Sequence, residues 1–111
     1  MRAFWLLLFA VGCSESPREC PALPTECPAT VPSYAMQIAP IISARCSSCH
    51  NTDDPNNPWP LDNLDDISDW RSQFEHEIKT CSMPPPDSGK SLPDEERALL
   101  YAWLVCGAPD N

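Results

Sequence analysis

Seven cysteines in a chain of 111 residues constrain the fold of this protein more than any other feature. Such a density fits an exported protein in an oxidising compartment, where small domains use covalent links to supplement a core that is marginal on its own. The seven are unevenly spaced, since two are three positions apart and the others are spread along the chain: Cys13, Cys20, Cys27, Cys46, Cys49, Cys81 and Cys106. Which cysteines pair with each other, and which bind another group, therefore limits the folds that the chain can adopt.

The segment Cys46-Ser47-Ser48-Cys49-His50 carries the strongest chemical signal in the chain. Two thiols three positions apart, with an imidazole directly after the second, are the attachment pattern of a c-type haem. Each thiol adds to one vinyl group of the haem, and the histidine then lies under the iron as an axial ligand. We therefore predict one covalent haem c, held by Cys46 and Cys49, with His50 bound to the iron.

Other sites also use two cysteines at this spacing. A structural zinc site needs a second ligand pair, and the candidates, Cys20 with Cys27 and Cys81 with His76, lack the tight spacing of such pairs. A thioredoxin-like site follows a strand in a βαβ unit, whereas the segment before the motif is predicted to be a short helix. A non-haem, cysteine-rich binding module of a surface lipoprotein stays open as an alternative.

The first residues are predicted to be an export signal. Arg2 precedes the apolar run 3–11, which is far shorter than the roughly 18 residues of a membrane span. The run ends in Ala10-Val11-Gly12-Cys13, which resembles the cleavage box of bacterial lipoproteins and implies that the signal 1–12 is removed and Cys13 is lipidated. The expected location is thus periplasm-facing and anchored to a membrane through acyl chains. A soluble periplasmic protein is the alternative.

Residues 13–33 contain five prolines and few large apolar residues, so we expect a linker in front of a domain at 34–110. Once Cys13 is assigned to lipid and the motif to haem, an even number of cysteines remains. These disulfide candidates are Cys20, Cys27, Cys81 and Cys106. Proximity in the chain favours the pairs Cys20–Cys27 and Cys81–Cys106 among the three possible connectivities.

Acidic residues outnumber basic ones by 16 to 7, which gives a net charge of −9. A nucleic acid is therefore a poor partner, because its phosphates would be repelled. The charge fits a redox partner with a basic docking face, and it equally fits a plain role in solubility.

The domain is predicted to be all-α, because no run of useful length alternates with period two. A first helix is indicated by the i, i+3, i+4, i+7 face of Ile38, Ile41, Ile42 and Arg45. A second helix is expected over 64–80. Its buried face would comprise Ile67, Trp70, Phe74 and Ile78.

The last predicted helix begins near Ser91 or Leu92. Ser91 is a favoured N-cap residue, Pro93 suits a first turn, and Gly107 is typical of a helix end. Its apolar stripe is Leu99, Leu100, Trp103 and Leu104.

Met83 is the candidate for a second iron ligand. It lies in the loop between the last two helices, and the three prolines after it stiffen that loop. A thioether favours Fe(II) and so raises the reduction potential. His76, between Glu75 and Glu77, is the runner-up and fits a solvated surface histidine, while Met36 is poorly placed. If Met83 only fills space in the core, the distal site is open, as in a haem peroxidase or ligand sensor.

The haem motif, the Met83-Pro84-Pro85 loop and the last helix with Gly107-Ala108-Pro109 together resemble a class I mono-haem cytochrome c domain of the compact bacterial type. The resemblance covers about 34–109. It implies packed helices, the first and last of which cross beside the haem, and a single-electron carrier rather than an enzyme, alone or as a subunit of a larger oxidoreductase. The haem-binding residues that it implies are Cys46, Cys49, His50 and Met83.

In that family a backbone carbonyl shortly after the motif accepts a hydrogen bond from the proximal histidine. Trp59-Pro60-Leu61 occupies a similar place here, so we expect a carbonyl near 58–60 to orient His50. The apolar wall around the haem is expected from Trp59, Trp70, Phe74, Leu99, Leu100 and Trp103.

Overall fold

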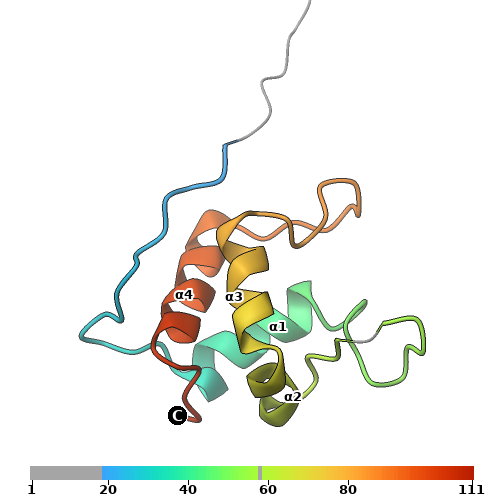
Figure 1. The fold of residues 1–111 in the computed structure, drawn as a ribbon, viewed down its shortest axis with the longest axis horizontal. Helices are drawn as coiled ribbons and strands as arrows, with labels where there is room; N and C mark the ends of the chain where they lie inside the picture. Colours follow the sequence, from blue (N-terminus) through green and yellow to red (C-terminus); the bar gives the residue numbers. More distant parts are fainter. Residues whose placement is uncertain (1–18, 58) are drawn as a thin grey trace, which may run out of the picture.

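The computed structural model describes residues 19–57 and 59–111. The predicted signal 1–12 and the lipidation candidate Cys13 lie outside these residues. The elements in chain order are the π-helical turn η1 (Tyr34–Ile38) and the α-helices α1 (Ala39–Arg45), α2 (Leu64–Asp69), α3 (Arg71–Lys79) and α4 (Asp94–Val105), arranged as Figure 1 shows. The described residues contain no strand, as the all-α prediction requires. Among them no helix is long and apolar enough to cross a membrane.

The first helical segment starts at a side-chain cap. The Ser33 hydroxyl accepts a hydrogen bond from the Met36 backbone N–H at 3.2 Å, which satisfies a donor at the start of η1. Pro40 lies in the first turn of α1, and the φ angle fixed by its ring suits that position. The apolar face predicted for this segment is buried, with Ile38, Ile41 and Ile42 all in the core.

The single helix expected over 64–80 is two helices, α2 and α3, so that prediction is wrong at one residue. Trp70 ends α2 and begins α3 with φ −107° and ψ 13°, outside the helical region. The break turns its indole out of the predicted buried face, and the side chain stays 39 % exposed against the Trp59 ring. Ile67, Phe74 and Ile78 remain in the core on either side of the break.

Helix α4 begins at Asp94, two or three residues later than expected. Pro93, not Ser91, occupies the cap position, and no side chain caps the helix. The acidic residues of the first turn instead place negative charge at the positive end of the helix dipole. The predicted end is confirmed, because Gly107 has φ 93°, a left-handed conformation that glycine adopts without steric cost.

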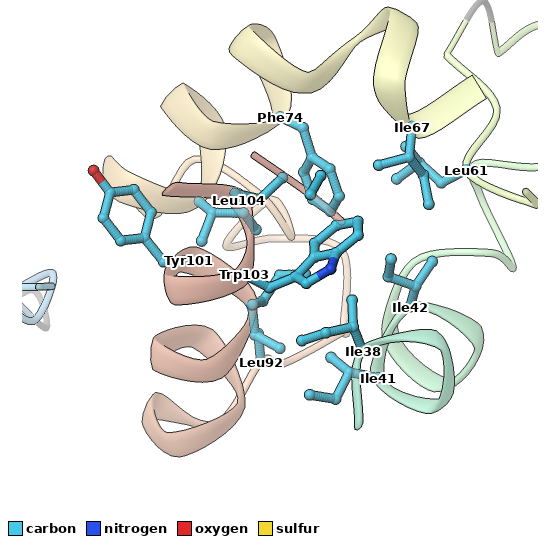
Figure 2. Packing of buried hydrophobic residues seen from close by; sticks show 13 residues of the cluster. Ile38, Ile41, Ile42, Leu61, Ile67, Phe74, Leu92, Tyr101, Trp103 and Leu104 are labelled. Atoms are coloured by element: carbon cyan, nitrogen blue, oxygen red, sulfur yellow. The ribbon is translucent and has the colours of Figure 1, made fainter. Parts of the chain in front are cut away.

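The core lies where α4 packs against α3 and η1. Trp103 is fully buried at its centre, between side chains of α1 and α3 in Figure 2. Its Nε1 donates to the Pro109 carbonyl at 2.9 Å, and its ring stacks on Tyr34 with the centroids 5.4 Å apart. Beside this stacked pair, the Asn111 side chain accepts a hydrogen bond from the Tyr34 N–H at 2.8 Å.

Two disulfides are present, and their connectivity corrects the expected one. Cys20 is bonded to Cys81 and Cys27 to Cys106, whereas the sequence favoured Cys20–Cys27 and Cys81–Cys106. Segment 19–33 does not fold back on itself but runs past α4 from one end to the other (Figure 1), so its two cysteines meet partners at opposite ends of that helix. The described part of the proline-rich segment is thereby fastened to the helices at two points.

Candidate haem pocket

A pocket that opens to solvent lies between the Cys46–His50 turn, α3 and the loop after Cys81. Its lining is mostly apolar. The pocket brings together all four residues predicted to bind haem, namely Cys46, Cys49, His50 and Met83.

The motif follows the end of α1 as a tight turn. The Cys46 N–H donates to Ile42 O at 2.9 Å, and the N–H groups of Cys49 and His50 both donate to Cys46 O, at 3.2 and 2.9 Å. This turn places both thiols and the imidazole against one cavity. Cys46 and Cys49 carry free thiols, whereas the other four described cysteines are in disulfides.

His50 is oriented by the backbone, as expected. Its Nδ1 lies 3.0 Å from the Trp59 carbonyl oxygen, within the predicted segment 58–60. Because a carbonyl can only accept, Nδ1 must carry the proton, which leaves the lone pair of Nε2 free to bind a metal. The Leu61 N–H donates to His50 O at 3.0 Å and fastens the same two segments together.

The loop from Asn51 to Asp62 holds the Trp59 carbonyl in place through side chains that bridge its two ends. The Asp62 carboxylate accepts from both the N–H and the hydroxyl of Thr52, each at 2.6 Å. These hydrogen bonds lower the pKa of Asp62, because they favour its charged form. Asn57 donates to Cys49 O and ties the middle of the loop back to the motif.

Burial sets the chemistry of the first thiol. It raises the pKa of Cys46 from 9.0 to about 11, against the opposing effect of the nearby Arg97 charge. Cys46 therefore stays a neutral thiol near pH 7. Cysteines that act in thiol–disulfide exchange have lowered pKa values instead, so Cys46 does not resemble the attacking thiol of a thioredoxin-like site.

The backbone of Met83 is held from two sides. Its N–H donates to Glu77 O in α3 at 3.4 Å, and its carbonyl accepts from Arg97 Nη1 in α4 at 3.2 Å. The same Arg97 nitrogen donates to Ile78 O at 2.8 Å, and the residue is only 6 % exposed. Arg97 thus links α4, the end of α3 and the Met83 loop beside the pocket, a role that the sequence analysis missed.

Three of the six residues expected in the apolar wall line this pocket. Trp59, Trp70 and Phe74 line the pocket, and the two indoles meet edge to face with their centroids 6.2 Å apart. The three residues from α4 do not line it: Leu100 and Trp103 are fully buried in the core, and Leu99 packs against that core. Residues that the sequence analysis did not assign to the wall supply the rest, namely Leu61, Ile78, Pro84 and Pro85.

The runner-up ligand His76 and the poorly placed Met36 lie elsewhere. His76 is exposed on α3, beside Ser72, Glu75 and Lys79, and does not line the pocket. Met36 is 82 % exposed on η1. Within residues 19–57 and 59–111 no three His, Cys, Asp or Glu side chains are grouped to hold a metal ion, so the zinc alternative finds no further ligands in the described residues.

The donor set of the pocket fits a haem. Two thiols and one imidazole nitrogen come from the motif, and a thioether comes from Met83 in the same cavity. Two cations, Arg45 and Lys90, stand at the pocket beside the apolar wall, and Arg45 is paired with Glu96 at 2.8 Å. Comparison of the chain with known proteins gave no match to a family model, to a curated protein or to a solved structure.

Proposed function

We propose that this protein is a single-electron carrier with one covalent haem c. In this proposal Cys46 and Cys49 form the thioethers, and His50 and Met83 are the axial ligands. The observation that carries it is the meeting of these four side chains, from two separate segments, in one apolar pocket. A bound haem would supply an iron that cycles between Fe(III) and Fe(II).

The protein residues would tune and protect that iron. The Trp59 carbonyl keeps the proton of His50 on Nδ1, so that Nε2 is presented as a ligand in one orientation. Met83 offers a soft sulfur, which favours the reduced iron. The apolar wall of Trp59, Trp70 and Phe74 would exclude water from the site and lower its local dielectric.

The rival functions receive less support from the pocket. An open-site peroxidase or ligand sensor requires that Met83 stay away from the iron, yet Met83 lines the pocket and its backbone is bonded to both α3 and α4. A non-haem binding module leaves unexplained why two unpaired thiols and an oriented imidazole face one apolar cavity.

The proposed setting is the periplasmic side of a membrane, with the chain anchored through Cys13. Its partners would be redox proteins, and the net charge of −9 favours those with a basic docking face.

Expression of the full chain with a cytochrome c maturation system, followed by a haem stain on a denaturing gel, tests the proposal. Haem that survives denaturation is covalent, and the variant Cys46→Ala/Cys49→Ala is expected to lose the stain. The variant Cys27→Ser/Cys106→Ser is a matched control, because it also lacks two cysteines but keeps the motif. A wild-type chain without stain, or a stain that persists without the motif cysteines, would contradict the proposal.

The axial ligand is tested separately by a matched pair of methionine variants. Met83→Ala is expected to convert a low-spin absorption spectrum into that of an open site, which binds carbon monoxide readily. Met36→Ala removes an exposed methionine outside the pocket and is expected to leave the spectrum unchanged. If Met83→Ala leaves the spectrum unaltered, Met83 is not the ligand, and the open-site alternative gains support.

A further inference from the structure

We propose that the Cys20–Cys81 disulfide positions Met83 at the pocket, and that its reduction by a dithiol releases Met83. The disulfide would then control the pocket in a redox-sensitive way and not only stabilise the fold. The positioning of Met83 stands independently of haem; its consequence for iron ligation rests on the proposed function.

The backbone at Cys81 is the first observation. Cys81 has φ 58°, a left-handed conformation that residues with a side chain rarely adopt. Here the chain leaves the end of α3 and turns toward Met83, and the side chain of the same residue is bonded to Cys20. The covalent bond holds in place a turn that the local sequence does not favour, since neither Gly nor Asn stands at this position.

The closeness of Met83 to this turn is the second observation. Only Ser82 separates Cys81 from Met83, so a change in the turn moves the methionine directly. The hydrogen bond from the Met83 N–H to Glu77 O is long, at 3.4 Å, and that from Arg97 to Met83 O is 3.2 Å. The first is longer than the usual range for N–H···O bonds and the second is at its upper end; the covalently held turn is the restraint on Met83 that a reductant can remove.

The position of the second disulfide is the third observation. Cys27 is bonded to Cys106 at the other end of α4, so segment 19–26 stays attached to the molecule when Cys20–Cys81 is opened. Cys20 and Cys81 are both partly exposed, and a reductant can reach them. The freed thiols would stay close enough to reoxidise, which makes the change reversible.

The chemistry balances as a thiol–disulfide exchange. A dithiol reductant attacks one sulfur of the Cys20–Cys81 bond, and its second thiol then resolves the mixed disulfide. The S–S bond of the protein accepts two electrons and two protons and becomes two thiols, while the reductant becomes a disulfide. Reoxidation reverses these steps.

The test compares oxidation of Met83 with that of Met36 in the full chain. Dilute hydrogen peroxide converts accessible methionines to sulfoxides, and peptide mass spectrometry gives the Met83:Met36 rate ratio, in which the exposed Met36 is an internal reference. We expect Cys20→Ser/Cys81→Ser to raise this ratio several-fold over wild type. The matched control Cys27→Ser/Cys106→Ser removes the other disulfide and is expected to keep the ratio near wild type.

Two results would overturn the positioning role: an unchanged ratio in Cys20→Ser/Cys81→Ser, or an equal rise in both double variants, which would mark general loosening. Circular dichroism confirms that both variants are folded before the ratio is read. In haem-bearing protein the Cys20→Ser/Cys81→Ser variant is expected to bind carbon monoxide while its haem stain persists. If the full chain carries no haem after expression with the maturation system but the ratio rises in Cys20→Ser/Cys81→Ser, the positioning of Met83 is supported and the proposed function is refuted. If the haem stain is present but the ratio is unchanged, the proposed function is supported and the positioning role is refuted.

Discussion

The two disulfides are predicted to contribute equally to global stability, because each closes the same loop when the other is present. Cys20 and Cys27 are 7 positions apart, and Cys81 and Cys106 are 25 positions apart. With either bond intact, the shortest path between the other two cysteines passes through both intervals, a loop of about 32 residues in place of the full separations of 61 and 79. The chain-entropy model assigns about 3.7 kcal/mol to a loop of this length.

Urea unfolding followed by circular dichroism measures this. The variants Cys20→Ser/Cys81→Ser and Cys27→Ser/Cys106→Ser are each expected to lose about 3–4 kcal/mol of unfolding free energy relative to wild type. The reasoning fails if the two losses differ by more than about 1.5 kcal/mol, or if either is below about 1 kcal/mol. Equal losses would also show that a difference in Met83 oxidation between these variants is a local effect of the Cys81 turn.

Three further changes test the packing and the site. Asn63 Oδ1 caps α2 by accepting a hydrogen bond from the Asp66 N–H at 2.9 Å. Asn63→Ala removes this cap and is expected to lower the unfolding free energy by about 1 kcal/mol, measured by a thermal melt. Asn63→Ser keeps a capping oxygen and should keep most of the stability. Trp103→Phe loses the bond to Pro109 and leaves a gap in the core; we expect a loss of about 2–3 kcal/mol in urea, against less than about 1 kcal/mol for Trp70→Phe at the surface. In protein without haem, the raised pKa of Cys46 stabilises the fold below pH 9 and this contribution is lost as the pH rises toward 11. The difference in unfolding free energy between wild type and Cys46→Ala should therefore shrink over that range; a constant difference would contradict the assigned pKa.

Local patterns in the sequence predicted the helices well, because the apolar spacing that they follow is a property of a few consecutive turns. Ile38, Ile41 and Ile42 are buried where the spacing placed them. The break at Trp70 was missed because Trp70 itself obeys the spacing of a single helix with Ile67 and Phe74. Its turn outward accompanies contact with Trp59, a residue from another segment. A one-dimensional pattern carries no information about that contact.

The same difference between local and long-range information applies to the candidate site. The carbonyl that orients His50 was predicted correctly, since it depends on short-range chain geometry, while haem attachment at 46–50 stays a prediction. The α4 members of the expected wall were wrong, because periodicity marks a residue as buried without saying which of two apolar spaces it faces. The disulfide pairing was wrong because nearness in the chain says little about an extended, proline-rich segment that passes the whole length of α4.

The crossed connectivity has a consequence for how the protein matures. A chain that enters an oxidising compartment with its N-terminus first presents Cys20 and Cys27 before either of their partners, and then Cys46 and Cys49. Oxidation in order of arrival would join these neighbours, and would close the motif thiols into a bond of their own. Under the proposed export and haem attachment, the native pattern therefore depends on timing: the motif thiols must be captured before they pair, and an early Cys20–Cys27 bond must be exchanged once Cys81 or Cys106 arrives.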